Sequence, residues 1–347
     1  MTAARAVEDF IIIGAGIAGL SCARAVQQAG AKPVVLERSR GVGGRCATRR
    51  VEAQPVDHGV IFLHGADPAF LEALEAVENA TPLPGWPKEV SGKGTPCQPE
   101  AFLPYQRRLA FAEGLTAFPK HLSRRLDVRL GSRVSLLGTT ENGFRVETED
   151  GSHWEAPNVI VALAVEQTFR LMEGLPSAAK EIRAARKLVG ELGTEPCLTL
   201  LAGYPLDGPA PYWDVLYPEE SAILMLASHD STKRPDKKSH VLVYQCRPRW
   251  SREHLEEDPS TWAAQILQEA ARLLGPWAGK PAWTQSHRWR YARTGTGATL
   301  TAPLLLEFPG GGKLGLAGEI FAAGGGVEAA WLSGQRLARR ILGDTNP

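Results

Sequence analysis

The residues best suited to chemistry stand near the start of the chain, in the stretch Gly14-Ala15-Gly16-Ile17-Ala18-Gly19. The first glycine permits a tight turn, the second lets a pyrophosphate approach the backbone, and the third lets a helix pack closely on a strand. The helix that follows directs free N–H groups and a partial positive charge at a bound phosphate. We expect these six residues to contact a dinucleotide.

A carboxylate follows at the distance that such a site requires. Glu37 ends the apolar run 33–36, where it can accept hydrogen bonds from both hydroxyls of an adenosine ribose and would repel a 2′-phosphate. The strand at 10–13, the helix at 17–29 and this second strand form one βαβ unit. That context favours a dinucleotide site over a glycine-rich structural turn.

A second glycine-rich and basic segment spans residues 38–45. Gly43 and Gly44 let the backbone pass close to a bulky group, and Arg45 can place a planar guanidinium beside a pyrophosphate. We count Arg38 as part of the same cofactor-binding segment. The segment looks like the clamp of FAD enzymes of the amine oxidase type, and the alternative is a solvated basic loop.

The C-terminal part offers a second turn of the same kind. A strand over 313–319 ends in Gly318 and Glu319, and a glycine-rich loop then leads through Gly326 into a helix over 327–342. The helix begins with Val327 and carries Ala330 on a face of small residues. Its N-terminus would stabilise an anionic reduced flavin by about 1 kcal/mol. The alternative is an ordinary amphipathic helix.

With both ends of the chain considered, the sequence resembles the FAD-dependent amine oxidase superfamily, and most closely its renalase-like branch. The stretches that carry the resemblance are 39–45, 287–293 and 326–335. The resemblance implies FAD as the cofactor, contacts from Gly59, Val60 and Ile61 to it, and a strand through Val134 that passes the adenine. We expect the FAD to be non-covalent, because Cys46 beside the clamp reads as a small buried residue; attachment through a cysteine is the alternative. The chain departs from the family pattern in two places. In the segment 57–62 it has His58 and lacks the usual glutamine, and at 324–326 three glycines replace a more polar run.

The expected fold class is α/β, with a Rossmann-like FAD-binding domain that has a mostly parallel sheet and a β-meander, beside a second α+β substrate domain on a mixed or antiparallel sheet. We expect 1–66, 112–168 and 284–347 to form the discontinuous FAD-binding domain. The segments 67–111 and 169–283 would form the substrate domain. A pocket between two such domains is the default expectation.

Periodicity places further elements along the chain. Helices are expected at 69–79, 115–126 and 261–274, and 82–99 reads as a long loop. The expected strands are 133–137, 143–148, 159–163, 195–202, 222–228, 241–247 and 283–291.

Four side chains are candidates for catalysis. In an extended segment, His287, Trp289 and Tyr291 share one face, which can cover a flat ring. His58 follows Asp57 and can donate a hydrogen bond near the flavin. For the first three, the alternative is a strand that buries aromatic rings in the core; for His58, it is a neutral structural histidine.

Composition narrows the class of protein. The 347 residues carry a net charge of +1, which suggests no nucleic acid partner. The five scattered cysteines contain no CxxC pair, and no HxxH spacing occurs, so we expect neither a disulfide framework nor a metal site. No apolar run approaches a membrane span, and residues 1–9 lack the apolar core of a signal peptide. We expect a cytoplasmic protein; its oligomeric state stays open.

The leading hypothesis is a flavoenzyme that takes a hydride from a small reduced substrate. The resemblance implies that the substrates are isomers of NAD(P)H reduced at the wrong ring carbon, with dioxygen as acceptor and hydrogen peroxide as product. No strong catalytic base is needed, because aromatisation drives the step. The alternatives are a flavin amine oxidase and an FAD-binding protein without turnover.

Overall fold

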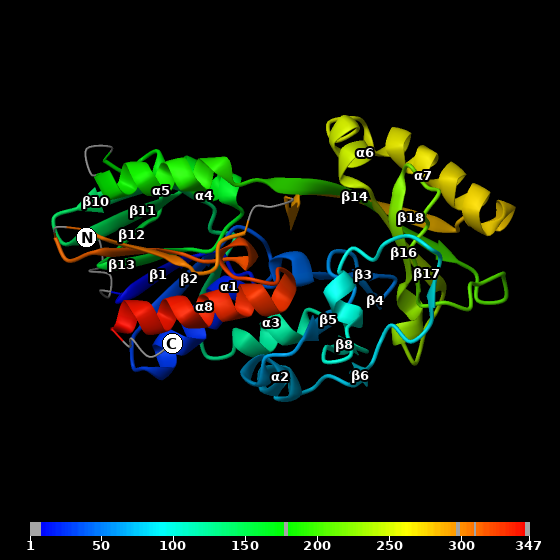
Figure 1. The fold of residues 1–347 in the computed structure, drawn as a ribbon, viewed down its shortest axis with the longest axis horizontal. Coiled ribbons are helices and arrows are strands. Elements are labelled where there is room, and N and C mark those ends of the chain that lie inside the picture. Colours follow the sequence, from blue (N-terminus) through cyan, green and yellow to red (C-terminus); the bar gives the residue numbers. More distant parts are fainter. Residues whose placement is uncertain (1–7, 177–179, 296–298, 309, 344–347) are drawn as a thin grey trace. The chain divides into compact units, whose positions relative to one another are not determined.

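The computed structural model describes residues 8–176, 180–295, 299–308 and 310–343. The chain forms two compact units, each built from separate segments (Figure 1). Unit 1 comprises residues 1–44, 118–194 and 294–347, and unit 2 comprises 45–117 and 195–293.

A largely parallel sheet forms the centre of unit 1. Its strand order is β19-β20-β13-β1-β2-β9, with β19 antiparallel to its neighbour and the other pairs parallel. Fully buried apolar strands are typical of such sheets, and β1 and β2 are buried along their whole length. The bounds are β1 Phe10–Ile13, β2 Pro33–Glu37, β9 Asp127–Leu130, β13 Asn158–Val161, β19 Leu304–Glu307 and β20 Lys313–Leu316.

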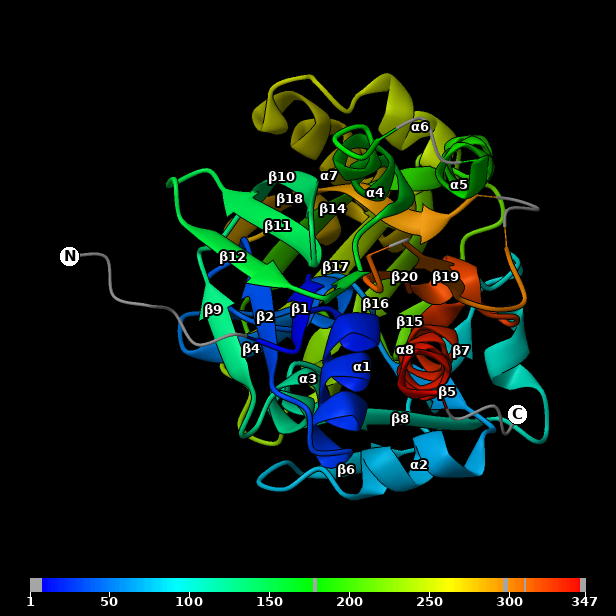
Figure 2. The same ribbon diagram turned by 90° about the vertical axis from the view of Figure 1, so that its left-hand side faces the viewer.

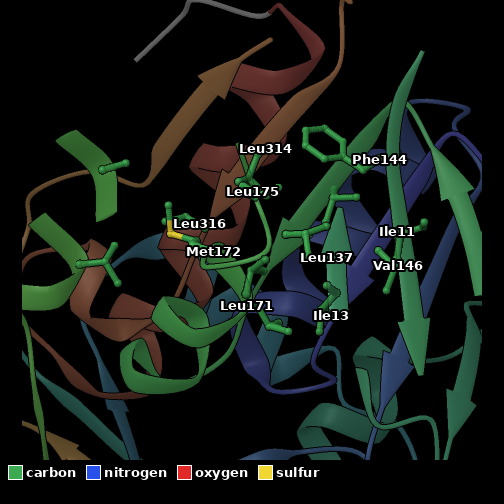
Figure 3. Close-up of a cluster of buried hydrophobic side chains, with 14 of the residues drawn as sticks. Ile11, Ile13, Leu137, Phe144, Val146, Leu171, Met172, Leu175, Leu314 and Leu316 are labelled. Carbon is green, nitrogen blue, oxygen red and sulfur yellow. The ribbon is translucent and has the colours of Figure 1, made fainter. Parts of the chain in front are cut away.

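An antiparallel meander packs over this sheet, with the expected turn at Asn142 and Gly143 (Figure 2). Its strands are β10 Val134–Thr140, β11 Gly143–Thr148 and β12 His153–Ala156. Helices α4 Val165–Met172 and α5 Lys180–Glu191 close the same core. Figure 3 shows side chains of the meander, such as Leu137 and Phe144, in one cluster with Ile11 and Leu314 of the sheet.

Helices α1 Ile17–Gln28 and α8 Gly326–Leu342 lie side by side in unit 1 (Figures 1 and 2). Gly334 makes this contact close, because a Cβ atom there would lie 2.3 Å from the carbonyl oxygen of Ala18. The Ser21 hydroxyl also donates to the Trp331 carbonyl oxygen at 2.8 Å. Two helices that are about 300 residues apart in the sequence are thus packed in one layer.

Unit 2 is built on a second sheet of order β18-β14-β17-β16-β15-β7. Its strands are β7 Val90–Ser91, β14 Thr194–Tyr204, β15 Val215–Leu216, β16 Leu224–His229, β17 His240–Cys246 and β18 Trp283–Thr294. Both antiparallel and parallel pairs occur. Helices α6 Pro248–Glu253 and α7 Pro259–Leu274 cover a core that includes Trp213 and Trp262. The two units confirm the expected fold class.

Shorter elements complete the chain. The hairpin β3 Thr48–Val51 and β4 Gln54–Asp57 leads into a small sheet of β5 Leu63–Gly65, β6 Pro82–Pro84 and β8 Arg107–Phe111. The segment 82–99 was expected to be a loop, but it contains the short strands β6 and β7. Their pairing partners, β8 and β15, are distant in the sequence, so the sequence did not predict these strands. The remaining helices are α2 Pro68–Glu75 and α3 Ala117–Leu122.

The boundaries of the two units differ from those of the expected domains. Residues 45–66, 112–117 and 284–293 belong to unit 2, and 169–194 belong to unit 1. Ion pairs explain part of this difference, since Asp57 pairs with Lys233 and Arg234. The helices α4 and α5 belong with unit 1 because they share the core of the meander.

Gly334→Ala tests the close contact between α1 and α8. An alanine in a helix interior is normally more favourable than glycine by about 1 kcal/mol. Here the added methyl group meets backbone atoms of α1, so we expect a net loss of about 1–3 kcal/mol and a lower Tm. Gly190→Ala in α5 is the control, since its methyl group would meet a phenylalanine ring edge instead. A Tm of Gly334→Ala at or above that of the parent would contradict the packing argument.

Candidate active site

The glycine turn after β1 has the geometry that its three glycines predicted. Gly14 has a φ of 107°, and a Cβ there would lie 2.6 Å from the Ala162 carbonyl oxygen. At Gly19 a Cβ would lie 2.0 Å from the Gly14 carbonyl oxygen, so the helix packs on the turn without room for a side chain. Apart from the chain neighbours of Gly16, no heavy atom in the described ranges lies within 4 Å of a Cβ added there. The turn is therefore open at Gly16, where a phosphate is expected.

Glu37 holds this turn in place. Its Oε2 atom accepts a hydrogen bond from the Ala15 amide at 2.8 Å, and its Oε1 atom accepts one from the Ser39 amide at 2.8 Å. An ionised carboxylate has about four acceptor positions, so positions remain for hydroxyl donors. Gly43 adds a third link, because its amide donates to the Ala15 carbonyl oxygen at 2.9 Å. The predicted clamp segment is thus hydrogen-bonded to the glycine turn that precedes α1.

The second glycine turn also belongs to unit 1. Gly324, Gly325 and Gly326 have φ values of 91°, 66° and 73°, a run of backbone angles that suits glycine alone. The amide of Gly318 donates to the Ser333 hydroxyl at 3.1 Å, which ties the loop to α8. The Glu319 carboxylate accepts from the amide and hydroxyl of Thr294.

The other predicted residues of unit 1 differ in exposure. Val327 and Ala330 are buried in α8, Val134 is partly buried at the start of β10, and Arg38 is exposed. The glycine turns, Glu37 and the clamp glycines are thus gathered in one unit.

Unit 2 brings three of the four predicted catalytic residues together. The rings of His58 and His287 meet edge to face with centroids 4.8 Å apart, and Trp289 lies 4.2 Å from His287 and 5.2 Å from His58. Arg290, on the opposite face of β18, pairs with Glu256, as strand alternation requires. Tyr291 is partly buried on the same strand. We call His58, His287 and Trp289 the imidazole–indole cluster.

Backbone contacts hold the segment after β4 against this cluster. The Trp289 indole donates to the His58 carbonyl oxygen at 2.9 Å, and the Val60 amide donates to the Arg45 carbonyl oxygen at 2.9 Å. A Cβ at Gly59 would lie 2.9 Å from the Trp289 ring and 2.3 Å from the Arg45 carbonyl oxygen. Only glycine at position 59 lets the backbone approach Trp289 and Arg45 this closely. Ile61, two residues later, is buried.

Both histidines of the cluster are held in the neutral form. Burial, together with the neighbouring His287 and Arg49, lowers the pKa of His58 to about 3. Burial and Arg49 lower the pKa of His287 to about 4. Near pH 7 the cluster offers neutral donors and acceptors, while Arg49 beside it carries a positive charge.

A buried group of four charges supports the segment that carries His58. Asp57 and Asp230 each contact both Lys233 and Arg234, over distances of 2.6 to 2.9 Å. Burial alone would raise the pKa of Asp57, but the two cations outweigh it and hold that pKa below its usual range. Lys233 also donates to the Ile61 carbonyl oxygen at 3.0 Å, so the charges fix the backbone on both sides of His58.

Several of these residues have no motif that marks them in the sequence. Arg49 and Lys233 stand in basic stretches that resemble solvated loops, and Gln245, which donates to the Gly59 carbonyl oxygen, has no motif around it. The available signal is the pair of β-branched residues Thr48 and Val51, which favours a strand. Successive residues of a strand point to opposite faces, so Arg49 and Arg50 would be separated.

The parallel sheet and the two glycine turns of unit 1 define a dinucleotide-binding protein of the Rossmann-like class. Residues 12–77 match the NAD(P)-binding Rossmann-like domain, and residues 83–342 match the flavin containing amine oxidoreductase family. The second match covers well over half of the chain, so the protein belongs to the flavin containing amine oxidoreductase family. The expected membership of this superfamily is confirmed.

The individual relatives match only a short part of the sequence. The chain is 35% identical over 60 residues to pseudooxynicotine dehydrogenase of Pseudomonas sp, and 40% identical over 63 residues to a putative flavin-containing monoamine oxidase of Mycobacterium tuberculosis. These matches cover 17% and 18% of this chain but 12% and 14% of the relatives.

Two solved structures share the fold over nearly the whole chain. A putrescine oxidase variant has a TM-score of 0.74 at 15% identity, with 96% of this chain and 98% of the other covered. Cyclohexylamine oxidase from Brevibacterium oxydans has a TM-score of 0.72 at 16% identity, with 97% and 99% covered.

The cofactor of this protein is FAD, as expected from the sequence. The residues of unit 1 fit its adenosine and pyrophosphate groups: the space at Gly16 is open, the Glu37 carboxylate keeps free acceptor positions, and α1 begins at the turn. In the described ranges, no group of three or more His, Cys, Asp or Glu side chains is arranged to hold a metal ion. Among the helices of those ranges, none has the length and apolar character to cross a membrane.

Lys233→Met tests the buried charge group. The variant leaves two buried carboxylates with one cation, so we expect unfolding free energy to fall by about 3–5 kcal/mol in urea titrations. Lys237→Met is the control, because Lys237 is exposed. A loss no greater than that of the control would show that the group contributes little.

His58 makes the stability of the protein depend on pH. The unfolded chain, with a histidine pKa of about 6.5, binds a proton that the folded chain refuses down to about pH 3. Stability is therefore complete above pH 6.5 and is lost as the pH falls, by about 2 kcal/mol between pH 7 and pH 5. His58→Gln removes this part of the pH dependence in urea titrations at the two pH values. The exposed His153, changed to Gln, is the control. Full retention of the pH dependence in His58→Gln would refute the assignment.

Proposed function

We propose that the protein is an FAD-dependent oxidase of dihydronicotinamides: it oxidises isomers of NAD(P)H reduced at the wrong ring carbon to NAD(P)⁺. The substrate gives up a hydride, dioxygen takes the two electrons, and two protons complete hydrogen peroxide. When bound, FAD supplies the chemistry by accepting the hydride at N5 and passing the electrons to dioxygen. The location that we propose is cytoplasmic.

In this proposal, unit 1 is the FAD-binding domain and unit 2 carries the substrate-binding residues. The cofactor contacts proposed for unit 1 are those of the two glycine turns, Glu37, Arg38, Gly43, Gly44 and Val134. Binding is non-covalent. Arg45, Gly59, Val60 and Ile61 belong to unit 2, and their contacts with FAD stay a prediction from the sequence. His58, His287, Trp289 and Tyr291 orient the substrate and exclude water from it.

The observation that carries the substrate class is the neutral imidazole–indole cluster beside the cationic Arg49. Amines are ammonium ions at neutral pH, and a nearby guanidinium disfavours their approach. A dihydronicotinamide ring is neutral and sits on a nucleotide with negative phosphates, so the same charge does not oppose it. Its oxidation also needs no strong base, and the two imidazoles, with pKa values of about 3 and 4, are weak bases.

Family membership favours a second candidate, oxidation of an amine. The family is described by that chemistry, and the solved structures with this fold include oxidases of putrescine and cyclohexylamine. An amine site of this kind needs aromatic rings that flank the substrate in parallel. In the imidazole–indole cluster the ring planes are inclined by 32° to 87°, which supports the first candidate.

Anaerobic mixing separates the candidates. The FAD-loaded protein is mixed with the dihydronicotinamide isomers, with ordinary NADH, and with putrescine or cyclohexylamine, and flavin absorption is followed. We expect the isomers to bleach the flavin at least tenfold faster than either NADH or the amines. Bleaching by an amine with no response to the isomers would establish the second candidate. No reduction by any of them would indicate an FAD-binding protein without turnover.

A further inference from the structure

An arginine that no motif singled out contacts the imidazole–indole cluster. Arg49 lies on β3, and its Nη1 atom donates to Oε1 of Gln285 at 3.1 Å. Its Nη2 atom lies 3.1 Å from Nδ1 of His287. Gln285 and His287 are two residues apart on β18 and so share a face of the strand. One planar guanidinium therefore contacts both side chains.

This contact decides which nitrogen of His287 carries the proton. A guanidinium has five N–H donors, no acceptor, and a pKa that keeps it charged in proteins. The Nδ1 atom of His287 must then be the acceptor. In the neutral ring the single proton lies on Nε2, which is left as a donor.

We propose that Arg49 is a positioning residue that fixes His287 as the neutral Nε2–H tautomer. The inference rests on the proposed function, because it assigns the Nε2–H donor to an acceptor oxygen of the substrate, such as the carboxamide carbonyl of a nicotinamide. A carboxylate in the place of Arg49 would have the opposite effect: it would take the Nδ1 proton and favour the imidazolium.

The charged neighbours of His287 agree with this role. Arg49 faces the ring from β3, and His58 faces it from the segment after β4. Asp57, the acid next to His58, is engaged by Lys233 and Arg234. Burial and the positive charge of Arg49 therefore both oppose a second proton on His287 and lower its pKa. The donor stays neutral over the range in which the protein is expected to work.

The ring nitrogens of His287 test the proposal directly. Two-dimensional ¹H–¹⁵N NMR that correlates histidine ring nitrogens with ring protons is recorded on the full chain from pH 8 to pH 5. We expect one Nε2–H tautomer that does not titrate above pH 5. In Arg49→Met the ring loses its donor and the neighbouring charge. We therefore expect a mixture of tautomers and a pKa raised by at least about one unit toward 6.5.

Two further variants make the result specific. Arg50→Met removes an exposed arginine from the other face of the same strand, and the His287 signals should not change. Arg49→Lys keeps the charge and one donor, so the Nε2–H tautomer should be largely restored. It also keeps the proposal testable if Arg49→Met does not fold, because a titrating or mixed ring in Arg49→Lys, like an unchanged ring in Arg49→Met, would overturn it.

A second readout separates this proposal from the proposed function. With a dihydronicotinamide isomer, Arg49→Met should weaken substrate binding about tenfold in the anaerobic reduction assay, and Arg49→Lys should recover part of it. If the parent reduces no flavin with any isomer, the proposed function fails. The NMR experiment still decides whether Arg49 positions His287.

Discussion

The hydrogen bonds of the Glu37 carboxylate are the interaction on which the rest of unit 1 depends. They join the end of β2 to the turn after β1 and to the start of the clamp segment. The turn then presents open space at Gly16 and the N-terminus of α1. Because Glu37 keeps acceptor positions in reserve, one side chain both shapes the turn and remains able to bind a ribose. Close packing of α8 on α1 places the helix after the second glycine turn in the same unit.

Unit 2 separates its charges from its neutral groups. Four charged side chains neutralise one another in the interior and hold the backbone around His58. His58 and His287 stay uncharged because burial and Arg49 oppose their protonation, and the Trp289 indole beside them carries no charge. A site of this kind can orient a flat neutral ring without acting as a strong base. This neutral and weakly basic character, more than family membership, favours a dihydronicotinamide over an amine as the substrate that we propose.

Structural features whose physical cause lies in neighbouring residues could be predicted from the sequence. The glycine turns follow from adjacent residues, the meander from Asn142 and Gly143, and the fold class from alternating strands and helices, which the structure and the family match confirm. Contacts between distant segments were not predictable. Arg49 meets His287 across 238 positions, and Lys233 meets Asp57 across 176. A single sequence shows the residue types of such pairs but not the pairing, so both arginine and lysine resembled solvated charges.

The flavin content of the purified protein, from its visible absorption and the amount of FAD released on denaturation, decides whether unit 1 binds FAD. We expect a yellow protein with one FAD per chain, all of it released. A colourless protein that takes up no FAD when incubated with it would contradict the claim that the two glycine turns of unit 1 form a flavin site.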